Sequence, residues 1–167
     1  MAAARQVCSV RRRLGRPLLA LVSLLSFPAW AHAQGCTAGR AGTFRLRVQP
    51  AVIAFDPPGP ADFEAGRIDA QREIRIDVRP EFGGGSNWTL CIRSDSPDAG
   101  GYGKPTSDFE WQLAGDVMWT PLETANRLVY AGRNRRRVIL LFRTVLDWGR
   151  DEPGDYGLPL TLTAYRQ

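Results

Sequence analysis

The cysteines are the residues of this chain whose type and spacing most clearly indicate chemistry. Of its three cysteines, Cys8 lies in residues 1–33, which have the pattern of an export leader described below, and Cys36 and Cys91 follow them. An even number of cysteines in an exported protein is typical of a disulfide framework. We predict a Cys36–Cys91 disulfide, which stabilises a fold by about 4 kcal/mol in the chain-entropy model. The alternative is a lipid anchor on Cys36, but Ala33 and Gln34 occupy the positions where a lipidation motif has leucine and a small residue.

Carboxylates gather near the C-terminal end, where they could hold a calcium ion or form the acid pair of a glycosidase. Their spacing differs from that of an EF-hand loop, which needs acids at alternate positions and a central glycine. We expect no metal, no cofactor and no catalytic site, with a glycosidase as the weakest alternative. The residues concerned are Asp147, Asp151, Glu152 and Asp155.

Residues 1–33 have the pattern of a secretory signal peptide. Five arginines precede the apolar run Leu18–Phe27, and Ala31–Ala33 provides a small-residue cleavage site. The apolar run is shorter than the roughly 20 residues that span a bilayer. We predict cleavage after Ala33, a single domain over residues 34–167, and a location in the periplasm or on the cell surface.

Cleavage would change the charge of the chain. The five arginines of the leader would leave, which lowers Lys+Arg from 22 to 17 against 17 Asp+Glu. A neutral domain gives no electrostatic reason to expect nucleic-acid binding. The single histidine, His32, also lies in the leader, so the domain cannot build a Ser-His-Asp site or a histidine metal site.

Apolar and polar residues alternate with period two along the domain, whereas no long stretch has a helical period. This pattern predicts an all-β, immunoglobulin-like antiparallel β-sandwich of about seven to eight strands. The run Val138–Phe142, within an expected strand over 138–146, is apolar on both faces, so we place it in a central, covered strand. The other expected strands are 44–48, 51–55, 74–78, 88–92, 109–113, 117–119, 128–130 and 156–165.

Three segments between these strands are expected to be loops. Asp56–Gly66 is rich in proline and glycine, which disfavours a central strand. Gly101–Thr106 lacks a phosphate loop's first glycine and the hydroxyl residue after Lys104, so we expect an ordinary surface loop. The cluster Arg133–Arg137 could bind anions, but its position between two expected strands favours a solvated hairpin turn.

The most specific motif of the domain is Asp151–Thr163. An acidic residue, a Pro-Gly turn and Tyr156 precede an alternating apolar segment. In immunoglobulin-like sandwiches such a tyrosine forms a corner, opening a strand while its hydroxyl bonds to backbone just upstream. We predict that Tyr156 is a buried corner and that the strand it opens is the last of the fold. The sandwich would then lack an edge strand, leaving a groove into its core.

The leader, the cysteine pair and this C-terminal strand resemble the subunits of chaperone–usher fimbriae and the spore coat protein U group. The resemblance implies an incomplete sandwich that is completed by a strand from another chain. It also implies a non-catalytic surface-appendage or coat subunit whose partner is another protein or a second copy, without nucleic acid. The strand-exchange candidates are Phe44, Leu46, Val48, Leu158, Leu160, Leu162 and Tyr165.

A glycan-binding sandwich is the alternative function. Tryptophan rings can provide a flat surface on which a sugar stacks, and two of them lack a clear core pattern. Trp119 and Trp148 are therefore the candidates for a ligand platform.

Overall fold

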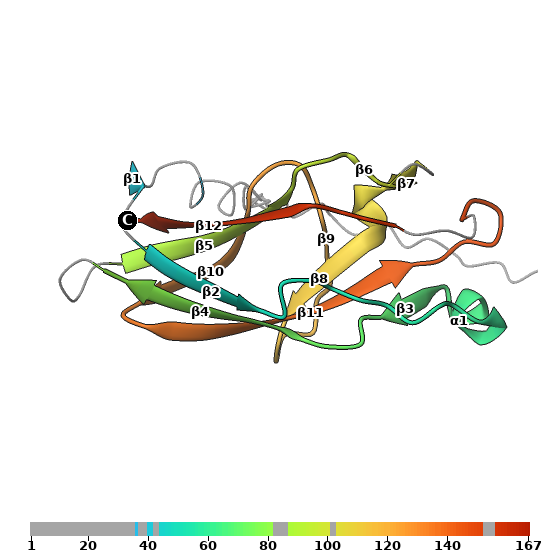
Figure 1. Ribbon diagram of the computed structural model, residues 1–167, viewed down its shortest axis with the longest axis horizontal. Coiled ribbons are helices and arrows are strands. Elements are labelled where there is room, and N and C mark those ends of the chain that lie inside the picture. The colour runs from blue at the N-terminus through green and yellow to red at the C-terminus, as the bar shows by residue number, and fades with distance from the viewer. Residues whose placement is uncertain (1–35, 37–39, 42–43, 82–86, 101–102, 152–155) are drawn as a thin grey trace, which may run out of the picture.

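The protein is an antiparallel β-sandwich (Figure 1). The structure, a computed structural model, describes residues 36, 40–41, 44–81, 87–100, 103–151 and 156–167. The predicted signal peptide and its cleavage site lie outside these residues. None of the described helices is long and apolar enough to cross a membrane.

The first sheet has the order β1-β12-β5-β10. Its central strand β5 pairs with β12 on one side and with β10 on the other. On β5, the side chains of Trp88, Leu90 and Ile92 alternate into the core, as a period-two pattern requires. The strand bounds are Arg40–Ala41 for β1, Asn87–Ser94 for β5, Arg127–Arg133 for β10 and Leu160–Arg166 for β12.

The second sheet has the order β2-β4-β11-β8-β9, and β3 pairs with the end of β11. As predicted, Val138–Phe142 lies in the central strand, but only one of its faces is fully covered, because Ile139 and Leu141 are half-buried. The bounds are Phe44–Gln49 for β2, Arg67–Asp69 for β3, Ile74–Pro80 for β4, Phe109–Leu113 for β8, Thr120–Pro121 for β9 and Arg136–Val145 for β11.

Small elements lie at the end of the sandwich opposite the C-terminus (Figure 1). A two-stranded hairpin, β6 (Asp98–Ala99) and β7 (Lys104–Pro105), is followed by the 3-10 turn Thr106–Asp108. Helix α1 (Pro60–Ala65) begins where the Asp62 side chain accepts the N–H of Gly59 at 2.8 Å. It ends at Gly66, whose φ of 68° favours glycine.

One hydrophobic core joins the two sheets. Trp88, whose side chain is fully buried, also donates its indole N–H to the Asn134 carbonyl at 2.8 Å. This hydrogen bond fixes the connection that crosses from β10 to β11. The other buried apolar residues are Ile74, Ile76, Val78, Leu90, Ile92, Ala99, Phe109, Trp111, Leu122, Val129, Val138, Leu140 and Phe142.

The predicted fold class is confirmed, and the strands beyond the expected number are short pieces of two or three residues. Several predicted boundaries are wrong. Residues 51–55 and 117–119 are not strands, 156–159 precede β12 instead of opening it, and the expected loop 56–66 contains α1. In 51–55, alternate residues Ile53 and Phe55 still pack against the core, so the apolar pattern reflects contact with the core without sheet pairing.

The arginine-rich turn is not a hairpin. β10 pairs with β5 in the first sheet, whereas β11 pairs with β4 and β8 in the second. Asn134 and Arg135 therefore connect two layers, and Asn134 adopts a φ of 61°. Asparagine tolerates this left-handed conformation better than most residues, which suits it to so short a crossing.

Candidate functional site

On one side of the sandwich the second sheet ends in β2, and the first sheet ends in β12 with only the two-residue strand β1 beyond it. We call this side the open margin. It consists of Phe44–Val48 on β2 and of residues 158–164, which include the start of β12 and the two residues before it. The two strands must be neighbours, because Ala41 pairs with Tyr165 and the chain enters β2 three residues later. The sequence-predicted exchange candidates therefore lie mainly on two facing strand edges.

Apolar side chains along the open margin contact the core without being fully covered. Every one of them is half-buried, although each packs against the fully buried cluster. Covering such side chains would gain about 25 cal/mol for each Å² of apolar surface removed from water. They are Phe44, Leu46, Val48, Leu158, Leu160 and Leu162.

The backbone edge of β12 is also available. β5 pairs with β12 along its whole length, but in the described part of the chain β1 is the only strand on the other side, and it reaches only Tyr165 and Arg166. Between Leu160 and Ala164 no described strand covers this edge. An uncovered edge presents N–H and C=O groups that can pair with another chain.

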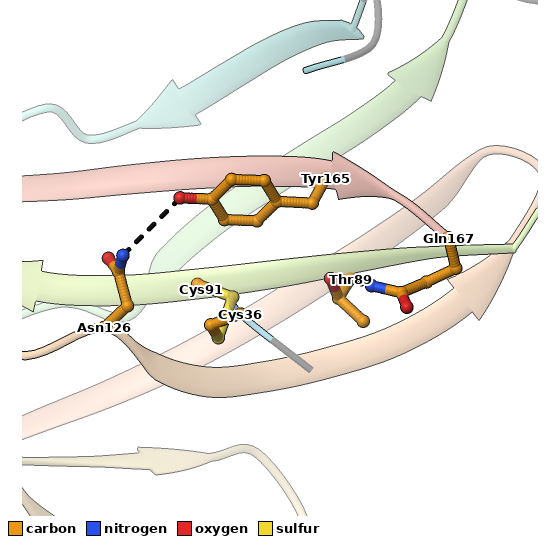
Figure 2. Close-up of a disulfide and its surroundings, with 6 residues drawn as sticks. All are labelled: Cys36, Thr89, Cys91, Asn126, Tyr165 and Gln167. Atoms are coloured by element: carbon orange, nitrogen blue, oxygen red, sulfur yellow. Dashed lines mark hydrogen bonds between the residues drawn. A yellow bond between two sulfur atoms is a disulfide. The ribbon is translucent and has the colours of Figure 1, made fainter. Parts of the chain in front are cut away.

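The Cys36–Cys91 disulfide is confirmed, with Cα atoms 6.1 Å apart. Figure 2 shows it beside β5, close to Tyr165 and Gln167. Cys91 lies opposite Thr163 of β12. On β5 it stands between Leu90 and Ile92, whose side chains face the core. Because side chains alternate along a strand, Cys91 faces the outer side of the sheet. The disulfide anchors the chain just before β1, which is the strand that closes one end of the open margin.

Tyr165 differs from the other exchange candidates. It alternates with the buried Ala164 and lies on the same outer side as the disulfide, and its hydroxyl oxygen is 3.5 Å from the Asn126 amide nitrogen (Figure 2). Tyr165 therefore does not contribute an apolar side chain to the open margin. Tyr165 was grouped with the leucines because the resemblance to strand-exchanging subunits covers the whole C-terminal strand.

A surface depression of about 830 Å³ lies at the far end of β2, beyond the open margin. Val48 belongs to both features. Two cations in its lining, Arg72 and Arg75, favour an acidic group over a basic one, although Arg75 already pairs with Glu73 at 2.7 Å. The remaining lining residues are Gln49, Pro50, Ala51, Gln71 and Glu73.

Tyr156 is half-buried and packs against the core four residues before β12 begins. The Lys104 ammonium lies 5.9 Å from the centre of its ring. Although β12 starts later than predicted, it is the last strand of the described chain. The hydrogen bond that would make Tyr156 a tyrosine corner stays a prediction.

Lys104 corrects the expectation of a surface loop, because it is only 4% exposed. Its ammonium donates to both carboxylate oxygens of Asp151 at 2.7 Å and to the Val145 carbonyl at 2.6 Å. Asp108 lies 3.6 Å away and pairs in turn with Arg150 at 2.6 Å. The carboxylates and cations thus form a chain of ion pairs, Asp151–Lys104–Asp108–Arg150, between β7 and the segment that leads to β12.

One residue of the predicted acidic group, Asp151, belongs to this network. Asp151 is committed to Lys104, and Asp147 donates its backbone N–H to Asp151 at 2.9 Å. Glu152 and Asp155 lie outside the described residues. Among the residues that are described, no group of three potential ligands could hold a metal ion.

Arginines from three segments lie near the Asp77 carboxylate of the second sheet: Arg137 of β11, Arg135 of the crossing turn and Arg47 of β2. Arg137 lies opposite Asp77 and donates to it at 3.1 Å. This hydrogen bond, with the nearby charges of Arg137, Arg135 and Arg47, holds the pKa of Asp77 below its usual value of 3.8. Part of the positive charge of the turn is therefore already neutralised.

The two predicted platform tryptophans have different surroundings. Trp148 is 63% exposed and stacks on Phe63 of α1, with ring centres 4.1 Å apart. Trp119 is half-buried, and the Arg143 guanidinium lies 4.3 Å from the centre of its ring. One face of each ring is thus already in contact with a neighbouring side chain.

Comparison with known proteins gives no assignment. No protein-family model matches the chain, and no curated protein matches it either.

Proposed function

We propose that this protein is an exported, non-catalytic structural subunit that assembles with a second copy of itself by strand addition. The observation that carries the proposal is the open margin, where a backbone edge that no described strand covers coincides with half-buried apolar side chains. Strand addition uses these two features together: main-chain hydrogen bonds supply affinity, and pockets for alternate side chains supply specificity.

The occupant of the open margin would be an extended segment with apolar residues at alternate positions. Such a segment would pair with β12 and place its apolar side chains between Leu160 and Leu162 on one sheet and Leu46 and Val48 on the other. The depression at the end of β2 could receive an acidic residue of the same segment beside Arg72. Export is supported by the leader pattern and by the disulfide, which persists in oxidising compartments.

Sedimentation of the purified exported chain tests this proposal. We expect the wild type to associate as its concentration rises, and Leu160→Lys to prevent association because it places a charge in the open margin. Thr161→Lys is the matched control: it lies on the same strand and bonds to Asp95 on the outer side at 2.7 and 2.9 Å. A wild type that stays monomeric, or equal effects of the two variants, would reject the proposal.

Glycan binding by a complete sandwich is the second candidate, favoured by the exposure of Trp148. The Phe63–Trp148 stack fixes the orientation of the indole and leaves much of the side chain accessible. Binding to immobilised polysaccharides that Trp148→Ala abolishes and Trp119→Ala weakens would favour this function. Binding that neither variant changes would exclude these residues as the platform.

A further inference from the structure

We propose that the Lys104 amine and the Asp151 carboxyl group condense into an intramolecular amide bond. This modification is independent of strand addition, because none of the residues of the ionic network, Lys104, Asp108, Arg150 and Asp151, belongs to the open margin. It would convert a buried ion pair into a covalent cross-link between β7 and the segment that enters the last strand.

The choice of residue is the first argument. The chain has 22 basic residues, and Lys104 is its single lysine. It is also the one fully buried basic side chain in the described part of the chain. Arginine is the residue that best suits a buried ion pair, because its planar group donates several hydrogen bonds in a fixed geometry. A lysine here supplies what arginine lacks, a primary amine that can act as a nucleophile.

Geometry is the second argument. Lys104 Nζ lies 2.7 Å from both Oδ1 and Oδ2 of Asp151, so the amine already touches the group it would attack. The backbone N–H of Asp147 donates to Asp151 Oδ2 at 2.9 Å. A donor at this oxygen stabilises the negative charge that develops there as a nucleophile adds to the carboxyl carbon.

The surroundings are the third argument. The side chains of Lys104 and Asp151 are only 3% and 5% exposed, and the rings of Phe109 and Tyr156 flank the ammonium, each at 5.9 Å. Removing two charges from water is costly even when they pair. Condensation removes both charges, so burial favours the amide over the ion pair.

The reaction balances without an added reagent. The ammonium first passes a proton to Oδ1 of Asp151 along their hydrogen bond, giving an amine and a carboxylic acid. After the carboxyl group rotates its face toward Nζ, the nitrogen forms a bond to Cγ. Asp108, 3.6 Å from Nζ, takes a second proton from the nitrogen and delivers it to the departing hydroxyl group. One water molecule leaves, Oδ2 becomes the amide oxygen, and Asp108 returns to a carboxylate, the form that Arg150 pairs with.

Mass spectrometry of the reduced and denatured protein tests the bond. We expect the wild type to be lighter than its sequence by one water molecule, and a proteolytic digest to contain a branched peptide joining residues 104 and 151. Lys104→Arg keeps the positive charge but cannot condense, so it should have its full sequence mass. An amine-labelling reagent should modify Lys104 only in the fraction that has not condensed.

A second pair of variants tests the role of Asp108. Asp108→Asn preserves the shape of the side chain but removes the proton carrier, so freshly folded protein should condense at least ten-fold more slowly. Asp98→Asn, an exposed change in neighbouring β6, should leave the rate unchanged. A wild type with its full sequence mass and a labelled Lys104 would overturn the proposal, and an unchanged rate in Asp108→Asn would overturn the assigned proton route.

Discussion

The two long margins of this sandwich differ in how far the chain covers them. On one margin the chain passes directly from β9 to β10, and Leu122 in this crossing is only 2% exposed. Its N–H donates to Phe109 in the second sheet, while the next residue, Glu123, accepts from Ser94 in the first, both at 2.8 Å. On the open margin, β1 covers only the end of β12, and the apolar side chains remain half-buried.

This difference in coverage indicates where the fold can accept another chain. A crossing segment joins the sheets covalently, buries a leucine and uses backbone groups of both layers. The open margin has the same kinds of residue, but within the described part of the chain no such segment lies over Leu160–Ala164. A strand from outside could therefore add there without displacing any described strand.

Removing the disulfide should have the largest effect on this comparison. The bond closes a loop of 55 residues, and we expect Cys36→Ala combined with Cys91→Ala to lower the free energy of unfolding by about 4 kcal/mol. It should also release β1 from β12 and lengthen the open margin. Urea denaturation measures the first effect, and amide exchange at Tyr165 and Arg166 measures the second. Unchanged exchange there would show that β1 does not depend on the disulfide.

Truncation of one leucine on each margin should separate the two directly. Leu122→Ala removes a fully buried side chain and should cost about 3 kcal/mol. Leu162→Ala removes a half-buried one and should cost about 1 kcal/mol in the isolated chain, since less apolar area is lost. If thermal unfolding shows the same loss of stability for Leu122→Ala and Leu162→Ala, the two margins cover their leucines equally.

The predicted tyrosine corner should contribute less. If the hydroxyl of Tyr156 bonds to backbone, Tyr156→Phe should lower the free energy of unfolding by about 1 kcal/mol, the usual net value of one hydrogen bond. Tyr165→Phe is the comparison on the last strand, because the contact of its hydroxyl with Asn126 is long at 3.5 Å. A stability loss no greater for Tyr156→Phe than for Tyr165→Phe would argue against the corner.

The smallest effect should come from Asp77, on the strand that pairs with β2. The hydrogen bond from Arg137 lowers the pKa of Asp77 in the folded protein. The ionised carboxylate therefore stabilises the fold fully at any pH above 3.8, the pKa of the unfolded chain. This contribution is lost as the pH falls through the lower pKa of the folded protein. Acid titration of stability should show this loss in the wild type and not in Asp77→Asn. Identical acid profiles would contradict the assigned interaction.

The sequence predicted the strands better than it predicted the margins. Strands such as β4 and β5 have one face in the core, so their alternation is visible locally. Whether β10 and β11 pair with each other or belong to separate sheets depends on residues far along the chain. The arginine-rich turn between them gave no local signal of the crossing, and it was interpreted as a hairpin for that reason.

The ionic network could not be predicted for a similar reason. Lys104 stands among glycine and proline, which indicates an exposed loop, and its two main partners, Asp151 and Val145, come from 47 and 41 residues away. The one available signal was compositional: a single lysine in a chain that otherwise uses arginine. The disulfide was predictable because only two cysteines follow the leader.

Amide hydrogen exchange along β12 tests the central claim most directly. In an edge strand of an antiparallel sheet, alternate N–H groups point away from the one partner. We predict that alternate amides within Leu160–Ala164 exchange rapidly in the monomeric exported chain and slowly in its oligomer, while those of β5 stay protected in both. An oligomer in which the β12 amides exchange as fast as in the monomer would contradict strand addition at the open margin.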